Sequence, residues 1–483
     1  MSRIICWDQY GKNGCKTLAI VLGLFYFGIY RSEGIVSIHA VQTGGQDRVT
    51  KRQSWDNWAG NLHSSPIEIF RPTTEDEIVA LVQQAANRGL RIKAFGAKHS
   101  FSGIAISDDY ILDLTSYDQI VEVDSVNGYV TVQSGKKLSH LSEELFTYGF
   151  AMEDMGDIAY QSIAGAISTG THGTGATFGC IPTQVHSMRI ITADGSVLNC
   201  SKDENQDIFH SARVSLGALG ILSTITLKCE TAFNLHAVEK PIALDEVMTN
   251  LDDFVDSNEH FEFFWQPNMQ NAFTKQNNRT TRPEEPLTDW ENFKNDVLIG
   301  DFIANNLVKV DRIAPPLSRF IRRNLPVTYR EDYVDRSYRV FTSERKVKFV
   351  EMEYFIPRAA AKDAMERYRT FLQQTGIVPS MSIEMRFTAA DDIPLSMSTD
   401  RETCSFAIHL RTHERYQQYF EGFETLMREF DGRPHWGKMH FQTKDTLMHL
   451  YPQWEQFQVV RKKLDPDGRF TNAYLNRVLG QIE

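Results

Sequence analysis

The sequence lacks the patterns that mark zinc sites, disulfide frameworks and nucleic-acid-binding surfaces. It has six cysteines in 483 residues, and no two have the C-x-x-C spacing of a zinc site or a thioredoxin-like redox pair. Their even count permits disulfides, but their scatter suggests no framework. The formal net charge is −11, and no long basic run gathers Lys and Arg on one segment. Nucleic acid is therefore excluded as the main partner, because phosphate binding needs a concentrated basic face.

No apolar run reaches the length of about 20 residues that a spanning helix needs. The apolar run at residues 17–30 carries no charge and follows Lys12 and Lys16, as in the h-region of a signal peptide. We therefore expect residues 1–45 to be a signal or anchor segment with a linker. This predicts membrane association through residues 17–30, or entry into the secretory pathway or periplasm. A mispredicted start or a buried helix is the alternative.

The common nucleotide-binding motifs are also missing. There is no G-x-G-x-x-G after the first predicted strand and no G-x-x-x-x-G-K-[ST], the motifs of Rossmann and P-loop sites. Glycine is nevertheless concentrated at residues 96–103, 165–179 and 217–220. Glycine lets the backbone approach a ligand, and successive amides can hold an anion. Three such stretches in one half of the chain favour a large phosphate-bearing cofactor over three ordinary turns.

Length and patterning predict two domains. A chain of 483 residues exceeds one ordinary core. Residues 46–232 alternate short strands and helices; one helix begins with a capping box of Thr74 and Glu77 and ends at Gly89. Residues 233–460 have longer segments and more aromatic side chains. We therefore assign these two ranges to separate domains of the α+β class.

Two predicted strands of the second half carry polar side chains on one face. In S-I-E-M-R-F, Glu384 and Arg386 are two residues apart, so both point to the same side of a strand. Apolar side chains take the other side, so the E-x-R face could line a cavity, whereas an exposed pair would contribute little. C-S-F-A-I-H-L-R repeats the pattern, with His409 opposite the apolar face. A structural role for this histidine is the simpler reading.

The segment G-R-P-H-W-G-K-M-H gathers His435, Trp436, Lys438 and His440 within six residues. A metal site of the two histidines would need further ligands, and no carboxylate accompanies them in this segment. We therefore predict no metal site.

Together these segments resemble the aldonolactone oxidases, which are vanillyl-alcohol-oxidase-type flavoproteins. G-A-K-H-S-F-S-G-I-A is similar to the first FAD loop of the family, S-I-A-G-A-I-S-T-G-T-H-G-T-G-A to the second and L-G-A-L-G-I to the third. E-M-R-F-T-A-A-D-D and the H-W-x-K segment are similar to its substrate domain, and K-L-D-P-D-G-R-F-T-N-A-Y-L to its C-terminal element. The resemblance extends from about residue 58 to the C-terminus.

This resemblance implies a fold, which is an α+β protein with a two-part FAD-binding domain of the vanillyl-alcohol-oxidase (PCMH) type. A sheet-based substrate (cap) domain follows, and residues 461–483 pack back near the flavin. The resemblance also implies FAD as the cofactor, with an 8α-histidyl covalent bond from His99. A non-covalent neighbour of the cofactor is the alternative role for His99. The other residues implied to border FAD are Gly96, Ala97, Lys98, Ser100, Phe101, Ser162, Gly165, Thr169, Gly170, His172, Gly173, Gly220, Ile221 and Asn472.

The resemblance further implies oxidation of a sugar-1,4-lactone by hydride transfer to flavin N5, with O2 as acceptor, H2O2 as a product and an ascorbate-like ene-diol after tautomerisation. Arg386 would stabilise negative charge on a substrate oxygen, and Glu384 would orient Arg386 and bind a hydroxyl. Lys438 would stabilise the reduced flavin or bind a substrate oxygen. His409 stands where relatives acting on open-chain alditols have a candidate base, so an alditol or other polyol is the alternative substrate. Gln161, before the second loop, leaves oxidase and dehydrogenase both open.

A protein that carries flavin without turnover is the remaining alternative. The E-x-R pair and Lys438 argue against it, because a purely structural flavoprotein has no need of a charged pair and a lysine at those positions.

Overall fold

The computed structural model describes residues 53–267, 269–288, 332–343 and 347–482. The chain divides into two units, residues 1–50 and 51–483, and every described residue belongs to the second. The predicted signal or anchor segment therefore lies outside the described residues. Within the described ranges, no helix is both long and apolar enough to cross a membrane.

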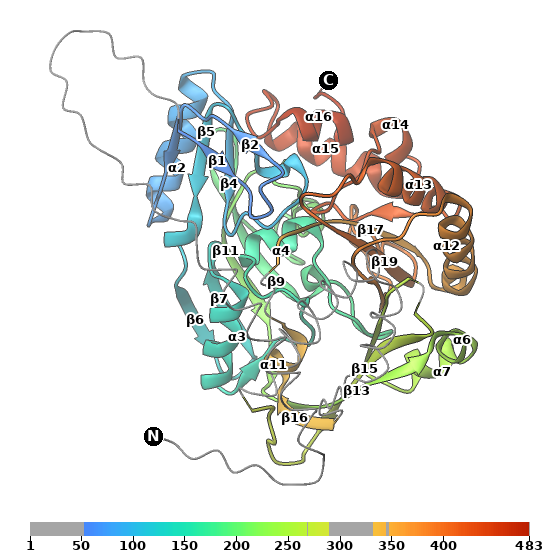
Figure 1. The fold of residues 1–483 in the computed structure, drawn as a ribbon. Helices are drawn as coiled ribbons and strands as arrows, with labels where there is room; N and C mark the ends of the chain where they lie inside the picture. The colour runs from blue at the N-terminus through green and yellow to red at the C-terminus, as the bar shows by residue number, and fades with distance from the viewer. Residues whose placement is uncertain (1–52, 268, 289–331, 344–346, 483) are drawn as a thin grey trace, which may run out of the picture. The chain divides into compact units, whose positions relative to one another are not determined.

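The first half of the second unit is built on two sheets (Figure 1). The smaller sheet is parallel, in the order β3-β5-β4, from β3 (Glu68–Phe70), β4 (Ile92–Phe95) and β5 (Tyr110–Asp113). The larger is antiparallel, in the order β10-β9-β11-β7-β6. Its strands are β6 (Ile120–Asp124), β7 (Tyr129–Gln133), β9 (Val185–Ile191), β10 (Val197–Ser201) and β11 (Ile221–Lys228). Two small ladders join β1 (Trp55–Asp56) to β2 (His63–Ser64) and β8 (Phe150–Ala151) to β12 (Glu230–Thr231).

Helix α2 (Glu75–Asn87) is the helix that the capping pattern predicts. Thr74 accepts a hydrogen bond from the Glu77 amide at 3.2 Å, whereas the Glu77 carboxylate accepts from the Thr73 amide at 2.7 Å. The reciprocal bond is therefore shifted by one residue from the standard capping box. Gly89 follows the helix with φ +67°, a left-handed conformation that suits glycine. The remaining helices of this half are α3 (Leu138–Thr147), α4 (Ile163–Thr169) and α5 (Gln206–Ala212).

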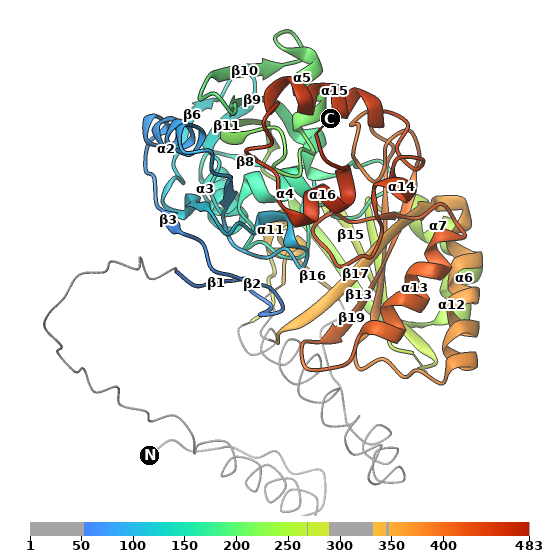
Figure 2. The same ribbon diagram turned by 90° about the horizontal axis from the view of Figure 1, so that it is seen from above.

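The second half is dominated by one antiparallel sheet of eight strands in the order β16-β13-β15-β14-β18-β19-β17-β20. The strands are β13 (Asn234–Ala243), β14 (His260–Trp265), β15 (Asn271–Thr280), β16 (Asp332–Arg336), β17 (Phe349–Pro357), β18 (Ile383–Thr388), β19 (Thr403–Arg411) and β20 (Arg433–Pro434). Figure 2 shows helices gathered on one side of this sheet. They are α6 (Leu244–Thr249), α7 (Leu251–Asp256), α12 (Ala361–Thr375) and α13 (Gln417–Arg428).

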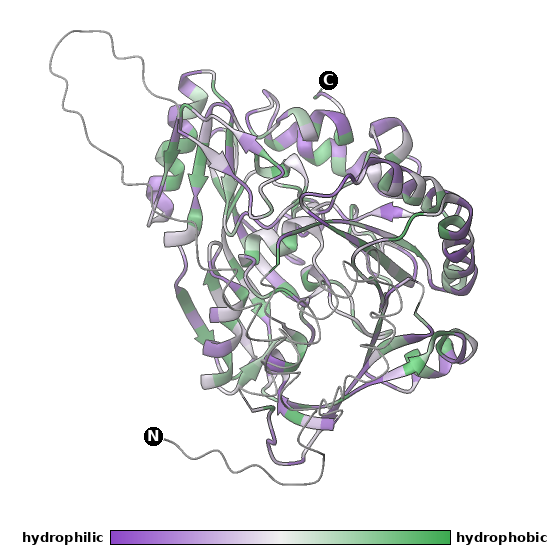
Figure 3. Cartoon of the chain, viewed as in Figure 1, coloured by the Kyte–Doolittle hydropathy of each residue, from purple (hydrophilic) through white to green (hydrophobic). Residues whose placement is uncertain are grey.

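The alternation of side chains along these strands separates an apolar face from a polar one. Met385 of β18 and Phe406 and Ile408 of β19 pack in the same buried cluster as Tyr368 of α12 and Phe423 of α13. The hydrophilic residues of α12 stand out along its ribbon in Figure 3. Because successive strand residues point to opposite faces, the residues between these apolar ones face the first half of the unit. The predicted two-sided strands are therefore present.

The C-terminal helices return to the first half of the unit. They are α14 (Lys444–Leu447), α15 (Trp454–Leu464) and α16 (Ala473–Leu479). Among the described residues, the second half also contains the short helix α11 (Ser337–Phe341). The Ile92 amide of β4 donates to the Arg469 carbonyl at 2.9 Å. The Lys93 ammonium donates to the Phe470 carbonyl at 2.9 Å. The predicted boundary after residue 460 falls inside α15, and that after 232 falls between β12 and β13.

Candidate active site

The loop that carries His99 begins directly after β4, where two loops meet at Gly96. A Cβ atom on Gly96 would lie 2.0 Å from the Ser162 hydroxyl oxygen, so only glycine fits this contact. Lys98 adopts φ +60°, a left-handed conformation that is costly for a residue with a side chain and is often found at functional sites. Two features therefore define the conformation of this loop: the close contact of Gly96 with Ser162 at the start of α4, and the strained backbone of Lys98.

A first cavity runs between the three glycine-rich segments. It brings together most of the predicted cofactor-binding residues, and Lys93, Gln161 and Leu216 add to its wall. At Gly220, with φ +150°, a Cβ would lie 2.6 Å from the Ile191 carbonyl oxygen. Close backbone approach at both Gly96 and Gly220 fits the cradle of an extended dinucleotide. The predicted residues that line this cavity are Gly96, Ala97, Lys98, His99, Ser100, Ser162, Gly165, Thr169, Gly220 and Ile221.

Three predicted cofactor neighbours line neither this cavity nor the one that meets it against the eight-stranded sheet. Gly170 ends α4 with φ +74°. The Gly173 amide donates to Asp154 at 3.0 Å, and a Cβ at Gly173 would lie 2.2 Å from that carboxylate. The Asn472 side-chain amide donates to the carbonyls of Gly103 and Ile106, each at 2.9 Å. Asn472 therefore fixes the backbone of the segment that follows His99.

A second cavity lies against the polar face of the eight-stranded sheet. It shares His99, Ser100, Gln161 and Thr169 with the first cavity, so the two meet at the His99 loop. Phe101 and His172, also predicted as cofactor neighbours, line this second cavity. So do all four predicted catalytic residues, which are Glu384, Arg386, His409 and Lys438.

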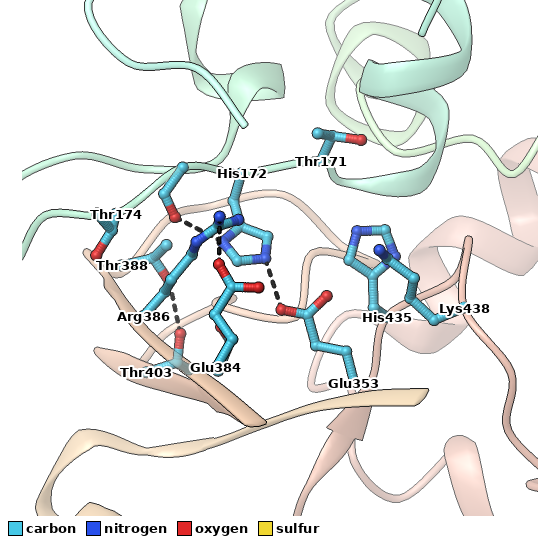
Figure 4. Close-up of polar contacts among 12 residues, drawn as sticks. Thr171, His172, Thr174, Glu353, Glu384, Arg386, Thr388, Thr403, His435 and Lys438 are labelled. Atoms are coloured by element: carbon cyan, nitrogen blue, oxygen red, sulfur yellow. Dashed lines mark hydrogen bonds and ion pairs between the residues drawn. The ribbon is translucent and has the colours of Figure 1, made fainter. Parts of the chain in front are cut away.

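Arg386 is held between the carboxylates of Glu262 and Glu384, and Figure 4 shows it beside Glu384. Its Nε lies 2.6 Å from the Glu262 carboxylate, and its Nη2 forms an ion pair with Glu384. Lys275 also pairs with Glu262, at 3.2 Å. Burial raises the pKa of the Glu384 carboxyl to about 7, where Arg386 opposes the rise and the charges of Glu262 and Asp157 add to it. Arg386 itself is only 8% exposed, so its guanidinium is fixed in a site with little water.

Lys438 reaches the same cavity from a segment bonded directly to the His99 loop. The Phe101 amide donates to the Gly437 carbonyl at 2.7 Å, and the Ser102 hydroxyl donates to the Trp436 carbonyl at 2.7 Å. The Lys438 ammonium lies 5.3 Å from the centroid of the Phe101 ring and pairs with Glu351. The H-W-x-K segment therefore joins the sheet to the predicted flavin loop.

The two predicted functional histidines have opposite pKa shifts. Burial lowers the pKa of His99 to about 4, and the nearby positive charge of Lys438 adds to this. Its ring stacks on Trp58 with centroids 5.2 Å apart. Burial acts to lower the pKa of His409, but the carboxylates of Glu351 and Glu384 and the Ser382 carbonyl together outweigh burial and raise it. The His99 ring is thus kept neutral, while His409 is ready to hold a proton.

His172, Glu353 and His435 form a buried cluster whose potential ligand atoms lie within 4.8 Å of one another. Hydrogen bonds engage both ring nitrogens of His172 and the Nδ1 atom of His435. His172 Nε2 lies 3.0 Å from Glu353, its Nδ1 lies 2.8 Å from the Gly173 carbonyl, and His435 Nδ1 accepts from the Gly437 amide at 3.0 Å. His440 instead bonds to the Tyr474 hydroxyl at 2.9 Å. These three side chains therefore form a buried polar network.

The sequence analysis missed the carboxylates that hold the polar side chains of the second cavity. Glu351 and Glu353 lie on β17 and line the second cavity, while Glu262 reaches Arg386 from β14. A signal was present in V-K-F-V-E-M-E-Y-F, where the two glutamates have the same spacing as the E-x-R pair. Period-two alternation would have placed both on the polar face, although it could not have named their partners.

Comparison with known proteins agrees with both halves of this arrangement. The chain matches the family model of D-arabinono-1,4-lactone oxidase over residues 225–478 and an FAD-binding-domain model over residues 66–201. An L-gulono-1,4-lactone dehydrogenase of Mycobacterium tuberculosis is 39% identical, covering 88% of this chain and 99% of its own. An L-gulonolactone oxidase of Bos taurus is 32% identical, covering 89% and 98%. An alditol oxidase of Streptomyces is 29% identical, covering 88% and 98%.

Solved structures agree with the predicted fold. A cholesterol oxidase from B. sterolicum superposes with a TM-score of 0.73 at 15% identity, covering 89% of this chain and 97% of its own. A chitooligosaccharide oxidase has a TM-score of 0.65 at 14% identity, covering 89% and 94%. These confirm the two-part FAD-binding domain with its sheet-based partner. The chain belongs to the D-arabinono-1,4-lactone oxidase family of FAD-dependent oxidoreductases.

Proposed function

We propose that the protein oxidises a CH–OH group of a sugar-1,4-lactone of the L-gulono or D-arabinono type, with FAD in the first cavity. The observation that carries this proposal is the junction of the two cavities at His99, Ser100, Gln161 and Thr169. A substrate on the polar face of the sheet would there meet the redox end of the cofactor. Bound FAD supplies a hydride acceptor, while the protein supplies binding, orientation and electrostatics.

Arg386 stabilises the negative charge that develops on the substrate oxygen. Its guanidinium is fixed by Glu262 and Glu384 before substrate arrives, so little reorganisation is needed during the reaction. Two groups can take the hydroxyl proton. One is Glu384, whose pKa burial raises to about 7, and the other is the Nε2 atom of His409. Both lie in the same cavity.

The charge balance of the second cavity favours a neutral substrate. Arg386 is paired with Glu262 and Glu384, and Lys438 is paired with Glu351. A carboxylate ligand would have to compete with these buried pairs, and breaking such a pair is costly. A lactone ring carries no charge and needs only hydrogen bonds, which these groups can provide.

An alditol is the second candidate substrate. It is supported by His409 in the cavity and by the 29% identity to an alditol oxidase. The lactone is favoured because the relatives at 39% and 32% identity are named for L-gulonolactone.

Anaerobic titration of the flavin-loaded protein tests this choice. We expect L-gulono-1,4-lactone to bleach the visible flavin band and xylitol to leave it unchanged. Admitting air should restore the band and yield one H2O2 per flavin, because we further propose O2 as the electron acceptor. Bleaching by xylitol alone would transfer the assignment to alditols. Recovery only with an added dye would make the protein a dehydrogenase, as the name of the mycobacterial relative suggests.

We also propose a covalent bond between His99 and FAD. A neutral imidazole is a nucleophile, and burial together with Lys438 keeps the pKa of His99 near 4. After acid precipitation, flavin should remain in the pellet of the parent protein and move to the supernatant for His99→Ala. His413→Ala, at an exposed position, is the matched control and should retain flavin in the pellet. Flavin released from the parent protein would refute the bond.

For residues 1–45 we propose a signal or anchor role that brings the protein to a membrane or into the secretory pathway. The support is the charge-free apolar run at residues 17–30 that follows Lys12 and Lys16.

A further inference from the structure

We propose that Glu351 is a positioning residue that couples Lys438 to His409, so that one carboxylate governs both the charge beside the His99 loop and proton uptake by His409. The proposal rests on the proposed function, in which these two side chains act on the substrate. Glu351 itself is a buried carboxylate of β17, 4% exposed.

The contacts of Glu351 reach both partners from one point. In the register between β17 and β19, Glu351 lies directly opposite His409. Its Oε1 lies 3.5 Å from His409 Nε2, and its Oε2 pairs with the Lys438 ammonium. Its backbone carbonyl also accepts from the Met439 amide at 2.9 Å. Side chain and backbone of Glu351 therefore both fix the Lys438 segment against the sheet.

The tautomer of His409 determines which of its ring nitrogens can accept a proton. His409 Nδ1 lies 3.0 Å from the Ser382 carbonyl oxygen, which can only accept, so the ring proton resides on Nδ1. Nε2 is then the atom that gains a proton, and it faces Glu351. When Nε2 takes the substrate hydroxyl proton, the O–H bond breaks as the N–H bond forms. The imidazolium produced lies against a carboxylate, which stabilises it.

Several charged groups act on this pair. Glu384 on β18 acts on His409 in the same direction as Glu351. Glu353 on β17 opposes ionisation of Glu351, whereas Lys438 and His409 favour it. Burial raises the pKa of Glu351, but these two cations outweigh burial and hold it at about 2. Glu351 therefore stays ionised over the working pH range, and its low pKa makes it too weak a base to hold the hydroxyl proton.

The test is the pH dependence of lactone-driven flavin reduction in the holoenzyme of Glu351→Gln. A base must be unprotonated to act, so kcat/KM falls as pH drops through the raised pKa of His409. Without the Glu351 carboxylate, burial lowers the pKa of His409 with less opposition. The acid limb of the kcat/KM profile should therefore move down by about one pH unit. Glu353→Gln is the matched control, because it removes a buried carboxylate of the same strand that pairs with His172 instead. Its acid limb should stay within a few tenths of a unit.

A second readout does not depend on turnover. In protein labelled at histidine Cε1, the His409 resonance is identified by its loss in His409→Asn, and its titration midpoint should fall in Glu351→Gln. If Glu351→Gln does not fold or does not retain FAD, Glu351→Asp is measured instead. Aspartate keeps the negative charge, so the His409 midpoint should stay close to that of the parent.

The results separate the alternatives. An unmoved midpoint in Glu351→Gln, or an equal movement in Glu353→Gln, would overturn the proposal. A moved midpoint with an unmoved acid limb would also overturn it, since Glu384 would then be the base. If no lactone reduces the parent flavin, the proposed function fails, while the resonance still decides whether Glu351 governs His409.

Discussion

Replacing Arg386 with leucine is expected to lower kcat/KM for the sugar lactone by about 10²- to 10³-fold, the usual loss when one preorganised stabiliser of an oxyanion is removed. Arg386 is buried and fixed by Glu262 at 2.6 Å and by Glu384. Leucine keeps the apolar part of the side chain nearest the strand but removes every hydrogen-bond donor. The effect should appear in the rate of flavin reduction measured in stopped flow, without a change in the FAD content of the purified protein.

The leucine variant should still fold because both carboxylates have another way to be accommodated. Glu262 retains Lys275 at 3.2 Å. Glu384, whose pKa is already about 7 because of burial, can take up a proton and become neutral. Arg386→Lys is the conservative control. It keeps the charge but loses the planar fork that contacts two carboxylates, so we expect an intermediate rate. A loss below tenfold, or one that follows FAD content, would contradict the role assigned to Arg386.

The strand patterns of the second half were predictable because they depend only on neighbouring residues. Alternation alone places Glu384 and Arg386 on one face and the intervening Met385 in the buried cluster under α12 and α13. The second carboxylate partner of Arg386, Glu262, was not predictable. Glu262 lies 124 residues away in the sequence, and only the order of strands in the sheet brings β14 beside β18.

The C-terminal element shows the same limit. Its sequence resembles that of the family, and the resemblance predicts that Asn472 lies near the flavin but does not name its partners within the protein. In the structure Asn472 binds the carbonyls of the loop that follows His99. The Lys93 ammonium makes a similar connection, because it donates to Gly217 at 2.7 Å and to Phe470 at 2.9 Å. These tertiary contacts fix the first and third glycine-rich loops in place, and no local sequence pattern predicts them.

The second large effect is expected at the contact between the first two loops. Gly96→Ala should lower the FAD content of the purified protein by about tenfold or more, since forcing extra atoms into a packed site costs typically 1–3 kcal/mol. The new Cβ would lie 2.0 Å from the Ser162 hydroxyl oxygen and 2.4 Å from its Cβ. One loop would have to move, and both line the first cavity. The flavin-to-protein absorbance ratio measures the loss, and circular dichroism checks that the chain remains folded.

A second substitution should reverse the first. Ser162→Gly removes both overlapping atoms and leaves the Ser162 Cα at 3.7 Å from the added Cβ, an ordinary contact distance. Glycine is also tolerated at a helix N-cap at a cost of only a few tenths of a kcal/mol, so α4 should survive. The double variant is therefore expected to bind more FAD than Gly96→Ala alone. Gly103→Ala is the control in the same loop, since its Cβ would lie 3.4 Å from Tyr474, and it should keep its FAD. Equal losses in the single and double variants would show that Gly96 acts through the cofactor contact itself rather than through Ser162.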